Sequence, residues 1–170
     1  MNELTYCPQC GKSGLRYEES KKWSCTACGF VLYNNCASAV AVVLQHRKDI
    51  LLTRRKNKPG MGLLDLPGGF SDPMETAEQT CKREIWEELQ IDLNPDSLCY
   101  LGSRPNKYLF KAIEYSTMDL FFRYDLLEKP KFLMCSEELS EVVWVPLKEL
   151  DLNELAFESQ RNFLKQYTLA

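Results

Sequence analysis

The apolar positions of the chain fall into short runs that predict a domain built mainly of strands. The run of small and β-branched residues at 37–44 predicts a buried strand, and 49–54 predicts its hairpin partner. Further strands are expected at 98–102, 107–114, 118–126 and 142–145. The polar stretch ahead of this pattern predicts a small module at 1–36, followed by a main domain at 37–170.

Two helices complete the predicted pattern. Apolar residues four positions apart line one side of the first helix, namely Ala77, Cys81, Ile85 and Leu89. Its predicted N-cap is Asp72, with Pro73 in the first turn, and its predicted end is Gln90. A helical turn at 147–150 and a helix near 155–167 follow. Several strands with few helices indicate a fold of the α+β class.

Composition and charge narrow the class of protein. Hydrophobic residues make up 45% and charged residues 26% of the 170 residues, as in ordinary globular chains. The net charge of −3 weighs against nucleic acid as a general partner. The sequence contains neither the run of about 18 apolar residues that a membrane span needs nor the apolar segment of a signal peptide. We therefore expect a cytoplasmic protein without membrane contact.

Four of the eight cysteines form a metal-binding pattern. They are Cys7, Cys10, Cys25 and Cys28, which make two C-x-x-C pairs, each followed by glycine. Four thiolates suit tetrahedral Zn²⁺ and leave no open coordination position, so we expect a structural zinc ribbon. A redox-active pair is the alternative, but neither pair is followed by the helix of a thioredoxin-like site. The scattered cysteines Cys36, Cys81, Cys99 and Cys135 are interpreted as small apolar residues.

The ribbon also carries aromatic and basic side chains. Tyr17, Trp23 and the lysines Lys12, Lys21 and Lys22 could contact RNA, substrate or a second subunit. The alternative is a solvated basic face around a small core, which is the usual meaning of such a charge run. The sequence leaves both readings open.

A second group of chemically active residues lies on the first helix, behind a loop at 56–73 that is rich in glycine and proline. Glu84, Glu87 and Glu88 are spaced i, i+3 and i+4, so all three lie on one helix face. Carboxylates gathered in this way repel one another unless a cation lies between them, and oxygen ligands suit Mg²⁺ or Mn²⁺. A solvated acidic face is the alternative explanation.

The full spacing from Gly69 to Ile91 resembles the Nudix box, G-x5-E-x7-R-E-U-x-E-E-x-G-U, where U is apolar. Gly69, Glu75 and Arg83 match, as does the stretch Glu84-Ile85-Trp86-Glu87-Glu88. The flanking run from Leu63 to Phe70 also looks like the family's lead-in. Two positions depart, because Gln90 stands where the family has glycine and Met74 stands where relatives often have glycine. The resemblance implies the Nudix fold, an αβα sandwich with a mixed sheet between helices.

The resemblance also implies a reaction and its residues. Nudix enzymes hydrolyse a nucleoside diphosphate linked to another moiety. By the resemblance, Glu84, Glu87, Glu88 and the carbonyl of Gly68 would hold Mg²⁺ or Mn²⁺, while Arg83 and Glu75 would pair and brace the helix. Glu137 and Glu138 are candidate general bases, with solvated loop acids as the alternative. Candidate substrate contacts are Tyr108 and the cations that flank the glycine loop, namely Arg54, Arg55, Lys56 and Lys58.

A zinc ribbon joined to this domain is similar to the NADH pyrophosphatase subgroup, although that subgroup's Ser-Gln-Pro-Trp-Pro-Phe-Pro signature is missing from 102–108. We therefore expect a small nucleotide substrate such as NADH or ADP-ribose. The alternatives are hydrolysis of RNA 5′ ends and a non-catalytic nucleotide sensor. A homodimer is expected by analogy with the subgroup alone.

Overall fold

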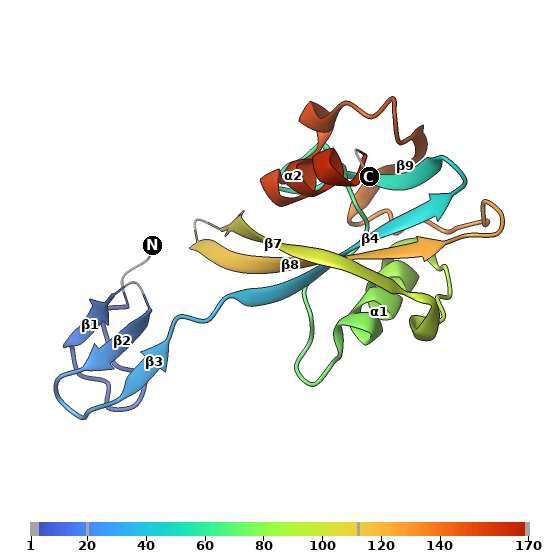
Figure 1. Cartoon of the computed structure of the whole chain (residues 1–170). Coiled ribbons are helices and arrows are strands. Elements are labelled where there is room, and N and C mark those ends of the chain that lie inside the picture. The colour runs from blue at the N-terminus through green and yellow to red at the C-terminus, as the bar shows by residue number, and fades with distance from the viewer. Residues whose placement is uncertain (1–3, 20, 112, 169–170) are drawn as a thin grey trace.

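The computed structural model describes residues 4–19, 21–111 and 113–168 and contains two β-sheets (Figure 1). The smaller sheet is antiparallel and consists of β1 (Leu15–Glu18), β2 (Lys22–Cys25) and β3 (Val31–Tyr33). Tyr17 pairs with Trp23 in the ladder, and their rings lie 4.6 Å apart. The structure thus has a hairpin whose arms contain Arg16-Tyr17 and Trp23-Ser24, as the sequence of the ribbon predicts, and β3 is an addition that the pattern did not indicate.

The larger sheet has six strands and follows residues 34–36. Its strands are β4 (Ala37–His46), β5 (Asp49–Arg55), β6 (Leu64–Asp65), β7 (Cys99–Phe110), β8 (Ile113–Asp125) and β9 (Leu139–Pro146). The order is β6-β5-β4-β8-β7, and β9 pairs with β5. The β4–β8 pair is parallel and the other pairs are antiparallel, so the sheet is mixed as expected.

One helix packs on each face of the larger sheet, α1 (Ala77–Leu89) and α2 (Glu158–Tyr167) (Figure 1). Successive side chains of β4 alternate between the faces, so Val40 and Val42 join the core under α1 while Ala41 and Val43 join the core under α2. Short 3₁₀ helices at Pro95–Ser97 and Leu152–Glu154 complete the elements. The predicted αβα sandwich is confirmed. None of the described helices is long and apolar enough to cross a membrane.

Three predicted boundaries differ from the structure. Residues 98–102 and 107–114 do not form two strands, because β7 continues through Pro105 with an irregularity between Tyr100 and Gly102. An edge strand tolerates proline, since its missing N–H can face away from the ladder. The first helix starts at Ala77, because Thr76 and Gln79 form a capping box in place of Asp72. The helical turn expected at 147–150 is present as a hydrogen-bonded turn over 147–149, one residue shorter than expected.

The two departures from the Nudix pattern keep a glycine-like backbone. Gln90 is the C-cap of α1 and adopts φ 56° and ψ 31°, the left-handed conformation that ends many helices. Its backbone N–H and its side-chain amide both donate to the carbonyl of Trp86, at 2.9 Å each. Met74 also has positive φ, at 72°. The helix end expected for glycine is therefore retained with glutamine.

Candidate active site

The loop before α1 is attached to β4 in a way that requires glycine at position 68. The carbonyls of Pro67 and Gly69 accept hydrogen bonds from the backbone of Val42 and Val40, at 2.9 and 2.8 Å. Gly68 has φ +143°, and a Cβ there would lie 2.3 Å from the carbonyl oxygen of Val40. A side chain at this position would therefore push the loop away from the sheet.

Arg83 connects this loop to the helix. Its guanidinium donates to both carboxylate oxygens of Glu75, at 2.8 and 3.0 Å, and to the carbonyl of Phe70 at 2.9 Å. Its Nη1 also donates to Glu84 at 2.8 Å and to Glu87 at 3.1 Å. The hydrogen bonds from Arg83 lower the pKa of Glu75 to about 2. The predicted pairing of Glu75 with Arg83 is thus present in the structure.

The carboxylates on α1 differ in exposure and in charge environment. Glu88 is only 8% exposed and accepts a 3.2 Å hydrogen bond from the N–H of Gly68. Burial, with the nearby acids Asp65 and Glu84, raises the pKa of Glu88 well above its ordinary value. Burial also raises the pKa of Glu84, against the opposing effect of Arg83. The side chain of Glu87, in contrast, is 56% exposed.

This donor set fits a divalent cation of the Mg²⁺ or Mn²⁺ kind. Carboxylate oxygens are hard ligands, and Glu88 is buried with no cationic side chain bonded to it among the described residues, while Glu84 is partly buried beside Arg83. The carbonyl of Gly68 is a further oxygen donor, because the loop's bonds to β4 use the carbonyls on either side of it. Arg83 lies between Glu84 and Glu87, so a cation would compete with it for their oxygens.

The carboxylate face of α1 opens into a cleft of about 390 Å³. Aromatic residues form another part of its lining: the ring of Tyr108 lies 5.2 Å from Phe70 and 5.8 Å from Phe157. Arg55 also lines the cleft, with its guanidinium 5.0 Å from the Phe157 ring centre. Acidic and aromatic side chains thus line a single cavity.

The structure brings most of the predicted site residues to this cleft. Those that line it are Gly68, Arg83, Glu84, Glu87, Glu88, Tyr108 and Glu138, while Glu75 lies behind them on Arg83. Arg54 lies elsewhere and bonds to Glu141 at 2.7 Å and to the carbonyl of Gly62 at 2.9 Å. Glu137 is also outside the lining.

Sequence reasoning missed a buried polar network beside the carboxylates. Asp65 receives a 2.6 Å hydrogen bond from Arg55 and another from the side-chain amide of Gln160. The same Gln160 accepts from the N–H of Leu66 at 3.0 Å, just before the glycine loop. Asp119 accepts from Thr117 and Ser159, at 2.7 and 2.6 Å. An acid inside the apolar run Leu-Leu-Asp-Leu was the signal that could have indicated Asp65.

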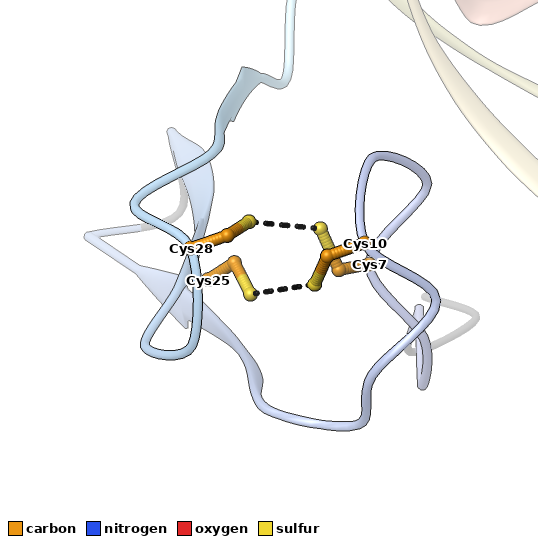
Figure 2. Close-up of side chains that lie close together, drawn as sticks. All are labelled: Cys7, Cys10, Cys25 and Cys28. Carbon is orange, nitrogen blue, oxygen red and sulfur yellow. Dashed lines mark hydrogen bonds between the residues drawn. The ribbon is translucent and has the colours of Figure 1, made fainter.

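The four N-terminal cysteines form a separate cluster (Figure 2). Their sulfur atoms lie within 4.8 Å of one another, with Cys7 3.7 Å from Cys28 and Cys10 3.9 Å from Cys25. A disulfide would need about 2.05 Å, whereas a tetrahedral ion with bonds of about 2.3 Å needs sulfurs about 3.8 Å apart. The cluster therefore has the geometry of a four-thiolate zinc site.

Each C-x-x-C pair is folded into a tight turn that directs its sulfurs inward. Gly11 donates to the carbonyl of Cys7 at 2.8 Å and Gly29 donates to that of Cys25 at 2.9 Å. Both glycines have positive φ, 68° and 76°, as expected from their place after each pair. Burial raises the pKa of Cys25, but backbone N–H groups that bond to its sulfur outweigh this and bring the pKa to about 7. A backbone N–H also lowers the pKa of Cys28, but burial and the neighbouring sulfurs outweigh it and raise that pKa to about 12. The geometry of the cluster, and not the acidity of its thiols, therefore indicates the metal site.

Comparison with known proteins agrees with the fold. The family model of the NUDIX domain matches residues 35–167, so the chain belongs to the NUDIX family. A NUDIX hydrolase structure from Nitrosomonas europaea is 26% identical and has a TM-score of 0.72. The match covers 98% of this chain and 91% of that chain. The NUDIX domain of Shewanella oneidensis NrtR, solved with ADP ribose, has a TM-score of 0.63 at 24% identity, with 80% of this chain and 90% of that chain covered.

Curated relatives include enzymes with two kinds of substrate. The NAD-capped RNA hydrolase NudC of Haemophilus influenzae is 30% identical over 59% of this chain and 38% of its own length. NudC of Vibrio cholerae is 28% identical over 86% of this chain and 51% of its own length. The ADP-ribose pyrophosphatase of Methanocaldococcus jannaschii is 40% identical over 45% of each chain. The alignments thus span about 38 to 51% of these relatives.

Proposed function

We propose that the protein is a Mg²⁺- or Mn²⁺-dependent hydrolase that cuts the pyrophosphate of a nucleoside diphosphate linked to another moiety, such as NADH or ADP-ribose. The observation that carries this proposal is the single cleft that joins the carboxylates of α1 to an aromatic wall. A dinucleotide has the complementary chemistry, since its phosphates suit cations held by carboxylates and its bases suit aromatic rings.

In this proposal Glu84, Glu87, Glu88 and the carbonyl of Gly68 hold the cations. Bound cations would neutralise phosphate charge and lower the pKa of an attacking water. Arg83 holds the loop against the helix through its hydrogen bonds to Glu75 and Phe70, so it acts as a positioning residue. Its bonds to Glu84 and Glu87 would weaken when cations bind, while those to Glu75 remain.

We assign the general base to Glu138 and the base-binding surface to Tyr108 with Phe70 and Phe157. Glu138 lines the cleft and approaches it from the loop before β9, so it can reach a water beside the carboxylates. Of the two neighbouring arginines, Arg55 and not Arg54 is the better candidate for a substrate contact, because Arg55 lines the cleft. Arg55 is already bonded to Asp65, so its proposed part is to shape the aromatic wall through Phe157.

We also propose that the chain consists of two domains with different roles, with the boundary between residues 36 and 37. The cysteine cluster at 1–36 would hold a structural zinc ion, because four thiolates leave no position for water or substrate. The main domain at 37–170 would carry the reaction. This division predicts that loss of zinc alters the ribbon before it alters the cleft.

A second candidate substrate is RNA with an NAD cap, because several of the matching relatives carry the name NAD-capped RNA hydrolase. The pyrophosphate of such a cap is the same linkage as in NADH. The two candidates differ in what is attached beyond the ribose, and the reaction at the carboxylates would be the same.

Product analysis on a substrate panel tests the proposal. The panel contains NADH, ADP-ribose, a dinucleoside tetraphosphate and an NAD-capped oligonucleotide, each with Mg²⁺ or Mn²⁺. We expect release of a nucleoside monophosphate from a dinucleotide, lost in Glu88→Gln and retained in the matched control Glu78→Gln on the same helix. Binding of ADP-ribose without turnover of any member would overturn the proposal in favour of a nucleotide sensor.

A further inference from the structure

A second cavity adjoins the proposed active site. Its volume is about 850 Å³, and it lies between the strands β7 and β8 and the start of α2. Three residues line both cavities: Asn106, Thr117 and Phe157. The two cavities are therefore neighbours, and a substrate bound at the carboxylates needs to extend only past these three side chains to reach the second one.

The sign of the charge reverses between the two cavities. Acidic residues dominate the first, which is lined by Asp65, Asp72, Glu84, Glu87, Glu88, Asp119 and Glu138 against two arginines. Cationic residues dominate the second, where Arg104, Lys107 and Arg161 stand against Glu158. The chain as a whole has a net charge of −3, so this gathering of cations is a local feature against the overall balance.

The three cations differ in how firmly they are held. Arg104 donates to the carbonyl of Ser103 at 2.6 Å and to the side chain of Gln166, and Arg161 donates to the carbonyl of Leu155 at 2.6 Å. These bonds orient the guanidinium groups. Lys107 pairs only with Glu114 among the described residues, at 3.1 Å and largely in solvent. An exposed ion pair of this kind contributes little to stability, so Lys107 can leave Glu114 and bind a phosphate with little loss of free energy.

We propose that the second cavity is a subsite for a further phosphate group of the substrate, attached beyond the pyrophosphate that is cleaved. The inference rests on the proposed function, because it takes the first cavity as the place of cleavage. The first cavity needs cations before it can accept phosphate, whereas the second can accept an anion directly on its arginines and lysine. A 2′-phosphate on a dinucleotide and the 3′-phosphodiester of a capped oligonucleotide share this chemistry.

Paired substrates test the subsite. We would measure kcat and KM for NADH, for NADPH and for an NAD cap extended by one nucleotide, in the full-length protein and in Lys107→Gln and Arg161→Gln. Lys165→Gln is the matched control, since Lys165 lies on the same helix as Arg161 but does not line the cavity. Each reaction would be run at low and at high salt.

We expect the wild-type protein to favour at least one phosphate-bearing substrate over NADH by about tenfold in kcat/KM, mainly through KM. Lys107→Gln and Arg161→Gln should remove most of this preference and leave NADH within about twofold, while Lys165→Gln keeps it. High salt should reduce the preference, because the contact is ionic. Preference for NADPH alone would assign the 2′-phosphate, and preference for the extended cap alone would assign the phosphodiester.

Equal kcat/KM for all three substrates in the wild-type protein, or equal losses on NADH and on the phosphate-bearing substrates in the variants, would overturn the subsite. Failure of the proposed function is a different result, namely no turnover of any substrate. In that case calorimetric titration of NADPH and of NADH into the wild-type protein and Lys107→Gln decides the subsite by binding alone. Tighter binding of NADPH that is lost in the variant would support it, and equal binding would refute it.

Discussion

Gly69 leaves room for the carboxylate of Glu84: a Cβ at position 69 would lie 2.7 Å from its carboxyl carbon and oxygens. The backbone of Gly69 does not have the positive φ of Gly68, so alanine is sterically compatible with its conformation. The two adjacent glycines thus serve different purposes. Gly68 lets the loop approach β4, and Gly69 lets Glu84 approach the loop.

This difference predicts that alanine at position 69 impairs mainly catalysis, whereas alanine at position 68 impairs mainly stability. Gly69→Ala should displace only the mobile end of Glu84, lowering kcat by about 100-fold while changing the free energy of unfolding by less than about 1 kcal/mol. Gly68→Ala meets backbone and positive φ, and should cost about 3 kcal/mol of stability. Urea unfolding and steady-state kinetics on both variants check this. Equal destabilisation by the two substitutions would contradict the assignment.

The neighbouring acids Glu137 and Glu138 provide a matched pair for the general base. Glu138 lines the cleft and Glu137 does not. We expect Glu138→Gln to lower kcat by about 100-fold or more, as removal of a general base commonly does, and Glu137→Gln to stay within about twofold. Metal affinity, measured by Mn²⁺ titration, should change little in either variant. A loss of activity in Glu137→Gln that equals the loss in Glu138→Gln would remove Glu138 from this role.

Acid should weaken the protein partly through Glu75. Its pKa is about 2 in the folded chain, against an ordinary value of 4.5, because Arg83 hydrogen-bonds to it. A lowered pKa gives stability that is complete above about pH 4.5 and is lost as the pH falls toward 2. Glu75→Gln should therefore lower the free energy of unfolding at pH 7 and flatten its decline between pH 4.5 and 2. Urea unfolding across this range checks the effect, with Glu78→Gln expected to keep the wild-type slope.

Removal of the metal from the cysteine cluster should affect the ribbon selectively. We expect metal analysis to find about one zinc ion per chain, lost in the double variant Cys10→Ser/Cys28→Ser and retained in Cys99→Ser, which alters an exposed cysteine outside the cluster. Trp23, whose ring packs against Tyr17 in the ribbon at a tilt of 34°, should report the change by near-UV circular dichroism. Full zinc content in the double variant would show that the metal lies elsewhere.

Neighbouring residues show where prediction from the sequence stopped. Arg54 and Arg55 are adjacent on β5, and their side chains point to opposite faces because one step along a strand reverses the face. The sequence pattern does not indicate which of the two faces the cleft. The pairing of β5 with β9 also shifts register between these two residues. Glu137 and Glu138 lie in a loop without periodicity, so their orientation depends on contacts made by the following strand.

The sequence by itself determined the features that depend on local spacing. The carboxylates of α1 share a face because of the helical repeat, the glycines of the loop and of the cysteine pairs stand where the backbone needs them, and the box from Gly69 to Ile91 indicates the family. The tertiary structure decided which distant residues meet. Gln160 and Phe157 reach the cleft because α2 packs on the sheet face beside β4, and there Gln160 meets Asp65 of β6. The cations of the second cavity likewise gather from β7 and α2. Such contacts arise from the packing of elements far apart in the chain, and local patterns do not contain that information.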